Sequence, residues 1–300
     1  MRNIGKLLFT LLFTVAVNVS GQSVSSASQS EAENLAQIKM QAESGDPNAQ
    51  FDLAWMYDTG DDSKILAKDV RKAAEWYEKA AIQGHAKAQT GLGLLYVNGN
   101  GMPQDYVKGV DWLQKAAAQG DPEAQLHLGW LYRDGKGIPK DHAKALVWWQ
   151  NAADRGFAHA QFVLGVIYNK GEIVPRNVDK TIEYWQKAVM QGYPSAQLNL
   201  GSMYYFGKGV PKDVVRATKL WEKAAAFGNA DAQYNLALAY HLGVGMQKDE
   251  LLSYVWSNLA VEYGGHLIAK KLRDSITLTP EQQKTADEMF ANWQIGKVYQ

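Results

Sequence analysis

One nine-residue block recurs along most of this sequence and restricts what the chain can fold into. The dipeptide Ala-Gln opens each copy, at positions 49–50, 88–89, 124–125, 160–161, 196–197 and 232–233. The steps between successive copies are 39, 36, 36, 36 and 36 residues. A fixed period of this length is typical of stacked-repeat proteins, in which each unit packs on its neighbours in the chain.

Each block predicts an amphipathic helix, called helix A below. We number every repeat from its Ala as position 0, and positions 0, 4, 7 and 8 are apolar or Tyr in all six copies. At 100° per residue these positions share one face of a helix, which we expect to be buried. Position 5 is Gly or Ala in every copy, although Gly weakens a helix by about 0.5–1 kcal/mol relative to Ala. The recurrence of such a small residue at position 5 predicts that another helix passes close to this point.

A second helix, helix B, is predicted after each helix A. The loop between them contains Gly, as in Asp134-Gly135-Lys136-Gly137, and the first Gly suits the left-handed position that follows a helix. An acidic or amide residue then stands where the N-cap of helix B is expected, at Asp69, Asp105, Asp141, Asn177, Asp213 and Asp249. We assign the Trp series of helix B and the Tyr of position 8 to the core.

These motifs together resemble the Sel1-like repeat family, an α/α solenoid related to tetratricopeptide repeats. The resemblance is carried by the Ala-Gln-x-x-Leu-Gly-x-x-Tyr block, the Gly-x-Gly loop and the helix B aromatic residue with its trailing Ala-Ala. It implies an all-α solenoid, a superhelix of about six Sel1-like helix pairs with capping helices at both ends. The expected organisation is a signal peptide at 1–21, a disordered lead-in at 22–30, an N-terminal capping helix at 31–45, six repeats at 46–264 and C-terminal capping helices at 265–300.

The N-terminus has the pattern of a secretory signal. Arg2 and Lys6 precede an uncharged, mainly apolar run at residues 7–17, and small residues around Ser20 offer a cleavage site. Because a membrane span needs about 20 apolar residues, we expect cleavage and a periplasmic or secreted protein without a stable span. The alternative is that the segment stays as an uncleaved membrane anchor.

Composition excludes several classes of function. The 31 basic residues equal the 31 acidic ones, so the chain lacks the basic excess of a nucleic-acid-binding protein. The absence of Cys excludes disulfides, thiolate metal sites and a Cys nucleophile. The six His show no close metal-ligand spacing. We therefore expect no catalytic residue, no metal site and no cofactor.

The resemblance implies a non-catalytic scaffold or adaptor that binds a protein or peptide segment in a concave groove, and that regulates a signalling or envelope-assembly protein. The alternative is an enzyme or binder acting on cell-wall or β-lactam compounds, because some Cys-rich members of the family have been linked to β-lactams. This chain has no Cys, so no catalytic residue is carried over from them.

The outward positions of helix A predict where a partner binds. Positions 3, 6 and 9 differ between copies, whereas the packing positions do not. Trp, Tyr and Arg are frequent anchors at interfaces, and Asn can hydrogen-bond a peptide backbone. The predicted groove residues are Asp52, Trp55, Asp58, His127, Trp130, Arg133, Asn169, Asn199, Tyr205, Asn235 and His241. For Trp55, Trp130 and Val166, the alternative is packing against helix A of the next repeat.

Overall fold

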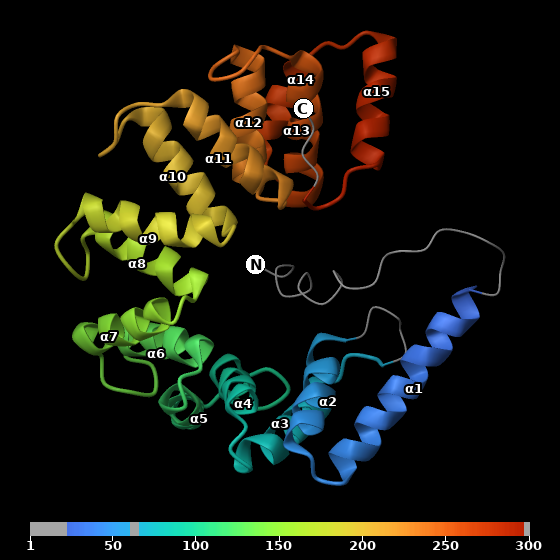
Figure 1. Cartoon of the computed structure of the whole chain (residues 1–300), viewed down its shortest axis with the longest axis vertical. Helices are drawn as coiled ribbons and strands as arrows, with labels where there is room; N and C mark the ends of the chain where they lie inside the picture. The colour runs from blue at the N-terminus through green and yellow to red at the C-terminus, as the bar shows by residue number, and fades with distance from the viewer. Residues whose placement is uncertain (1–22, 61–65, 297–300) are drawn as a thin grey trace. The chain divides into compact units, whose positions relative to one another are not determined.

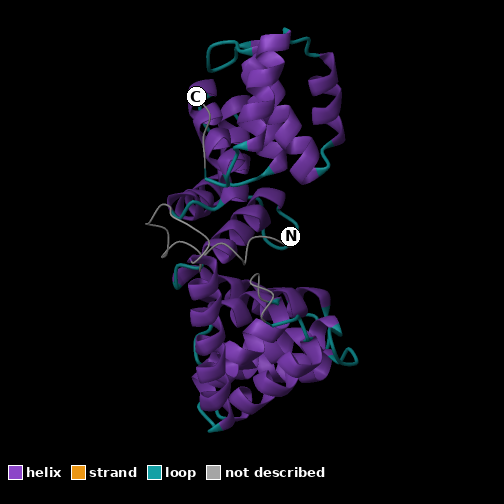
Figure 2. Ribbon diagram, turned by 90° about the vertical axis from the view of Figure 1, so that its right-hand side faces the viewer, coloured by secondary structure: helices purple, strands orange, loops and turns teal. Residues whose placement is uncertain are grey.

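The protein is described from a computed structural model that covers residues 23–60 and 66–296, with side chains from residue 31 onward. The predicted signal peptide lies outside the described residues. The described chain contains fifteen helices and no strand (Figures 1 and 2). It falls into two compact units, Met1–Trp112 and Leu113–Gln300, which are treated separately below. The prediction of an all-α chain of repeated helix pairs is confirmed.

Helices A and B alternate along the chain. Helices A are α2 (Pro47–Thr59), α4 (Ala86–Asn98), α6 (Pro122–Asp134), α8 (Ala158–Lys170), α10 (Pro194–Phe206) and α12 (Ala230–Leu242). Helices B are α3 (Val70–Ile82), α5 (Tyr106–Ala118), α7 (His142–Asp154), α9 (Val178–Met190), α11 (Val214–Ala226) and α13 (Glu250–Gly264). Within each unit, helix A packs on helix B of its own repeat and helix B packs on the next helix A.

The ends of the chain carry extra helices. The front helix, α1 (Ser23–Glu43), begins at Ser23 rather than at Glu31, so it includes most of the stretch that the sequence predicts as a disordered lead-in. The physical reason is that residues 23–43 contain neither Pro nor Gly, and Ser is only modestly unfavourable in a helix. At the back lie α14 (Leu267–Ser275) and α15 (Pro280–Ala291), which begins with a capping box between Thr279 and Gln282.

Helix B begins where the sequence predicts. In the third repeat Asp141 accepts a hydrogen bond from the backbone N–H of Lys144 at 2.9 Å, which satisfies an amide that the helix leaves unpaired. The Lys144 ammonium also lies over the ring of Tyr132 at 5.6 Å from its centroid. The same cap and cation–π pair recur in the other repeats up to Arg216 over Tyr204. Tyr132, Tyr168, Tyr204 and Tyr240 are buried, as expected for core residues.

The loop after helix A uses glycine as predicted. Gly135 has φ 69° and ψ 34°, the left-handed conformation, and its N–H donates to the carbonyl of Leu131. Any other residue would be strained there because of its Cβ.

The glycines at position 5 are explained by an aromatic ring. The Trp149 indole N–H donates to the backbone carbonyl of Leu126 at 3.1 Å, and a Cβ added at Gly129 would overlap the indole. Trp185 meets Gly165 in the same way, as does Trp221 with Gly201. The prediction that a helix comes too close at position 5 is therefore refined: the neighbour is the Trp side chain of helix B in the same repeat.

The Gln at position 1 links successive repeats. Its side-chain amide donates to a carbonyl near the end of the preceding helix B, as in Gln161 to Ala153 at 3.1 Å and Gln233 to Ala225 at 3.1 Å. The same carbonyl also accepts the N–H of the glycine that follows the helix, as in Gly156 to Ala153 at 2.9 Å, so the Gln amide adds a further hydrogen bond that comes from the next repeat. In two repeats a second Gln, just after helix B, donates to the Oε1 atom of the buried Gln: Gln83 to Gln50 at 2.8 Å and Gln191 to Gln161 at 2.9 Å.

The second Gln is missing from the third, fifth and sixth repeats. Its place is taken by Arg155, Phe227 and Tyr263, and in those repeats the Oε1 atoms of Gln125, Gln197 and Gln233 are buried without a hydrogen bond. A buried acceptor left unpaired costs stability.

The indole contact makes a testable prediction at Gly165. Gly165→Ala should lower the free energy of unfolding by about 1–3 kcal/mol, because the added methyl group displaces Trp185. In a Trp185→Leu background the same change should be neutral or stabilising, since Ala favours a helix by about 0.5–1 kcal/mol over Gly. Denaturation of the four proteins measures the coupling. Equal effects in both backgrounds would contradict the assignment.

The unpaired Gln197 makes a second prediction. Phe227 is 51% exposed, so Phe227→Gln removes little buried apolar surface and restores a donor. It should raise the free energy of unfolding by about 0.5–1.5 kcal/mol. The reverse change, Gln191→Phe, leaves the Oε1 atom of Gln161 without a hydrogen bond and should lower the free energy of unfolding by about 1–3 kcal/mol. Thermal melts of both variants test this, and a destabilised Phe227→Gln would show that the second Gln has no such role.

Candidate functional site

Three predicted groove residues lie on α2, in the first unit. Trp55 is 40% exposed, Asp52 is exposed and Asp58 is half-buried. Burial raises the pKa of both carboxyls above the usual range, because an apolar environment disfavours the charged form. These side chains are therefore accessible from solvent on helix A, as the sequence predicts, and they lie outside both clefts described below.

A cleft with a volume of about 470 Å³ lies in the second unit, between the third and fourth repeats. We call it the Trp130 cleft. It is lined by Trp130, Arg133, Asp134, Lys140, His142, His159, Phe162, Val163, Val166, Ile167, Lys170, Glu172 and Ile173. These residues come from α6, the start of α7, α8 and the two A-to-B loops. The structure thus brings together Trp130 and Arg133 of the predicted set.

The wall formed by α6 is an ordered stack. The Trp130 ring contacts Trp149 edge to face, with centroids 4.8 Å apart, and the Arg133 guanidinium lies 4.3 Å from the Trp130 ring centroid. Arg133 also donates twice to the carboxylate of Asp134, at 2.6 and 3.0 Å, which holds the pKa of Asp134 below its usual range. Trp130 therefore packs on helix B of its own repeat and remains half-buried.

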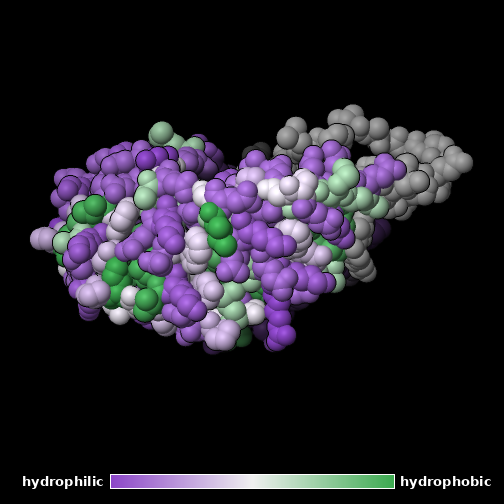
Figure 3. Space-filling model, turned by 90° about the horizontal axis from the view of Figure 1, so that it is seen from below, coloured by the Kyte–Doolittle hydropathy of each residue, from purple (hydrophilic) through white to green (hydrophobic). Residues whose placement is uncertain are grey.

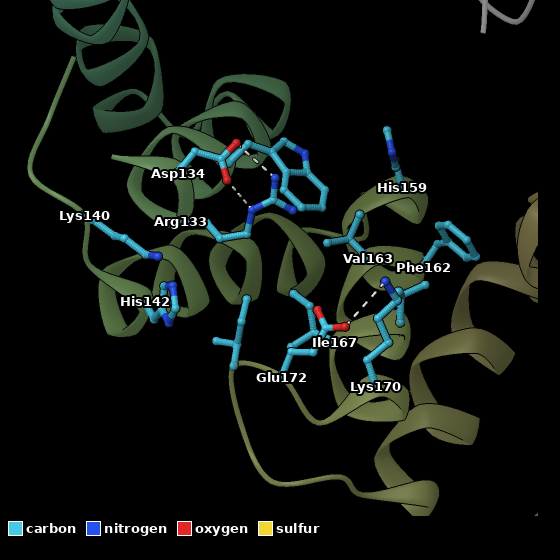
Figure 4. Close-up of a pocket in the computed structure, with 13 residues that line it drawn as sticks. Arg133, Asp134, Lys140, His142, His159, Phe162, Val163, Ile167, Lys170 and Glu172 are labelled. Carbon is cyan, nitrogen blue, oxygen red and sulfur yellow. Dashed lines mark hydrogen bonds and ion pairs between the residues drawn. The ribbon is translucent and has the colours of Figure 1, made fainter. Parts of the chain in front are cut away.

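The opposite wall and the rim are shown in Figure 4. Val163 and Ile167 of α8 present apolar side chains to the cleft, and Lys170 pairs with Glu172 at 3.8 Å. Lys140 and His142 line one side, while His159 and Phe162 lie across from them. The cleft thus combines an apolar floor with a charged rim, which suits a ligand that is part apolar and part polar.

A smaller cleft of about 100 Å³ lies between the fifth and sixth repeats. We call it the Tyr205 cleft. Its lining residues are Ser202, Tyr205, Phe206, Trp221, Asn235, Leu238, Ala239, Leu242 and Val244, and none is charged. The Tyr205 ring lies 5.2 Å from Trp221 and 5.0 Å from Phe206. Tyr205 and Asn235 of the predicted set meet in this cleft.

Four predicted residues of the second unit also line neither cleft. His241 pairs with Glu250 at 2.8 Å, and Asn169 and Asn199 are half-buried on α8 and α10. His127 is half-buried, and desolvation lowers its pKa to about 4, with a smaller contribution from nearby His159.

Sequence reasoning missed most of the rim. Lys140, His142 and Glu172 lie in or beside the loops between helices A and B, whereas the prediction considered only outward positions on helix A. A signal for these residues was available in the repeat pattern, because in a stacked repeat the loop after one helix A runs beside the next repeat. The face drawn in Figure 3 is mainly hydrophilic, with hydrophobic residues in small separate groups.

The half-buried imidazole of His127 predicts that the stability of the fold is sensitive to acid. Because the folded pKa of His127 lies below the ordinary 6.5, the unfolded chain binds more protons between about pH 6.5 and pH 4. Stability is therefore lost as pH falls through this window, by at most about 3 kcal/mol from this group. Melts at pH 7 and pH 4.5 should show a smaller difference for His127→Gln than for wild type. His142→Gln is the matched control, since His142 is exposed; an unchanged slope in His127→Gln would refute the assignment.

Two further observations concern metal binding and membrane spanning. No group of three or more His, Asp or Glu side chains in the described part of the chain could bind a metal ion. None of the helices within residues 23–60 and 66–296 combines the length and apolarity needed to cross a membrane.

Solved structures similar to this chain are Sel1 repeat proteins. A Sel1 repeat protein from Oxalobacter formigenes is 32% identical, with a TM-score of 0.72 over 80% of this chain and 68% of that one. A protective antigen present in uropathogenic Escherichia coli strains, described as displaying an SLR fold, is 33% identical with a TM-score of 0.68 over 86% of this chain. The chain spans 56% of the antigen's length. An immunity protein from Pseudomonas aeruginosa shares the fold at 22% identity, with a TM-score of 0.52 over 79% of this chain and 86% of that one.

No curated protein gives a significant match. The Sel1 repeat family, in contrast, matches six consecutive segments, at residues 47–85, 86–121, 122–157, 158–193, 194–229 and 230–263. These segments coincide with the helix pairs of the structure and cover most of the chain. The chain therefore belongs to the Sel1 repeat family.

Proposed function

We propose that this protein is a non-catalytic scaffold that binds a segment of a protein partner on the helix A side of its second unit. Sel1 repeat proteins generally mediate protein–protein interactions. The observation that carries the proposal is the Trp130 cleft, where an apolar floor lies beside a stacked Trp–Arg pair. Trp and Arg supply much of the binding energy at protein interfaces, because they combine large apolar area with directional hydrogen bonds.

The geometry of the wall supports a role in recognition. The Arg133 guanidinium is already oriented by Trp130 and Asp134, so little side-chain freedom remains to be lost when a partner binds. The remaining predicted groove residues of this unit, such as Asn199, lie on the same series of A helices and would contact the segment beyond the cleft.

We place this function in the periplasm or outside the cell. The basic and apolar pattern at residues 1–21 supports export, and the similar Escherichia coli protein is described as a protective antigen. A partner in the cell envelope or on a host surface would be reachable from that location.

Site-specific photo-crosslinking tests the proposal. A benzoylphenylalanine at Val166, in the cleft, should crosslink one protein in an extract of the source cells, whereas the same group at exposed Val147 of helix B should not. The captured protein, identified and purified, should then bind wild type at least ten times more tightly than the Trp130→Ala/Arg133→Ala variant. Equal melting temperatures of the two proteins are the control for folding.

Two results would overturn the proposal. Equal crosslinking from Val166 and Val147 would move the binding surface off the helix A face. Crosslinking of no protein from either position, in extracts of both the envelope and the growth medium, would favour a small-molecule ligand over a protein partner.

A further inference from the structure

The Trp130 and Tyr205 clefts occupy the same place in the repeat. Eight of the nine residues that line the Tyr205 cleft have a counterpart in the Trp130 cleft 72 residues, or two repeats, earlier, and Trp221 is the exception; the pairs include Arg133 and Tyr205, Val163 and Asn235, Val166 and Leu238, and Lys170 and Leu242. Both clefts lie in the unit Leu113–Gln300. A ligand that follows the A helices therefore meets two clefts that are equivalent in position.

The rim of the Trp130 cleft carries excess positive charge. Its cations are Arg133, Lys140 and Lys170, and its anions are Asp134 and Glu172, so three positive charges face two negative ones and the net is +1 with both His neutral. Arg133 holds Asp134 through two hydrogen bonds, and Lys170 pairs with Glu172. Lys140, which is exposed beside His142, has Asp134 as an electrostatic neighbour, but that carboxylate is already engaged. The rim is therefore complementary to one further carboxylate.

The Tyr205 cleft has the opposite character. None of its lining residues is charged, and two of them, Phe206 and Leu242, are 61% and 54% exposed at its edge. Large apolar side chains exposed together around a cleft are characteristic of a surface that a partner covers. The cleft is small, at about 100 Å³, which suits a single apolar side chain.

We infer that the two clefts bind one extended segment of a protein partner, with an acidic side chain and an adjacent apolar side chain in the Trp130 cleft and a second apolar side chain in the Tyr205 cleft. This inference rests on the proposed function and specifies the chemistry of the partner. Between the clefts, the Asn199 amide on α10 is placed to hydrogen-bond a peptide backbone.

The repeat spacing also sets the distance between the anchors. Packed helices lie about 8–10 Å apart, so two repeats correspond to roughly 20 Å. Since an extended chain rises about 3.3 Å per residue, the two anchors should be about six residues apart. A short ligand could occupy one cleft but could not reach both.

Synthetic peptides test this directly. The probes are fluorescein-labelled, C-terminally amidated peptides in a Gly-Ser background, carrying Asp-Leu as one anchor and Leu as the other, at spacings from three to ten residues. Amidation removes the terminal carboxylate, so that only the Asp side chain supplies the negative charge. We expect the tightest binding near a spacing of six, and at least a tenfold loss when either anchor is replaced by Ser.

Charge variants assign each anchor to its cleft. Lys140→Glu should weaken the Asp-Leu peptide at least tenfold and should accept a Lys-Leu peptide instead. Leu242→Glu should abolish the contribution of the second Leu to the binding affinity. The contribution of the Asp-Leu anchor should remain. The matched controls are Lys136→Glu and Leu267→Glu, which change exposed side chains outside both clefts and should bind like wild type.

Two outcomes would overturn the inference: equal binding of Asp-Leu and Lys-Leu peptides to wild type, or Lys140→Glu and Leu242→Glu variants that bind like their controls. These outcomes are distinguishable from failure of the proposed function. If a crosslinked partner still depends on Trp130 while the peptides show no dependence on anchors, the scaffold function stands and only the two-anchor chemistry is wrong.

Discussion

The hydrogen bond from the buried Gln of helix A to the end of the preceding helix B connects one repeat to the next. A helix leaves its last carbonyls without partners, and burying such a group unpaired is costly. At the end of helix B the turn glycine donates its N–H to such a carbonyl, at 2.9 Å both for Gly120 to Ala117 and for Gly156 to Ala153. Gln125 and Gln161 add a second bond to the same two carbonyls from the next repeat, at 3.2 and 3.1 Å. The same side chain makes the same bond at the junctions formed by Gln125, Gln161 and Gln233, so these repeats of the second unit attach in the same manner. The unpaired Oε1 atoms of Gln125 and Gln197 show that the remaining capacity of this side chain is used in some junctions only.

Within a repeat, the corresponding role belongs to the Trp of helix B. Its indole N–H reaches a backbone carbonyl of helix A, and the glycine at position 5 leaves the space that the ring needs. This explains why the chain keeps a residue that is unfavourable in a helix: the loss of about 0.5–1 kcal/mol is offset by a buried ring with a satisfied donor. In the sixth repeat position 25 is Ser257 and position 5 is Ala237, so no glycine is needed there, whereas the second repeat keeps Gly93 although its position 25 is Leu113.

Stability and recognition are thus carried by different positions of the same helices. Positions 0, 1, 4, 5 and 8 are nearly constant, because each one makes a contact that every repeat needs. The cleft walls come from positions 3, 6, 9 and 10 and from the loops, where Arg133 in one repeat corresponds to Tyr205 two repeats later. The chain is neutral overall, yet one cleft rim is positive and the other cleft has no charge. A repeat architecture permits this, since changing an outward side chain leaves the packing between repeats intact.

The sequence by itself determined the fold class, the helix pairs and their caps, because the signals for these are local: hydrophobic period, an acidic N-cap such as Asp141, and a left-handed glycine such as Gly135. It also indicated that Trp130, Arg133, Tyr205 and Asn235 face outward. Only the tertiary structure decided that position 5 accommodates an indole, that α1 extends back to Ser23, and that Lys140 and Glu172 join Trp130 in one cleft while His127 and His241 do not. The physical reason is that a cleft forms between repeats. Its lining depends on which loop and which next helix come together in space, and spacing along one helix carries no information about that.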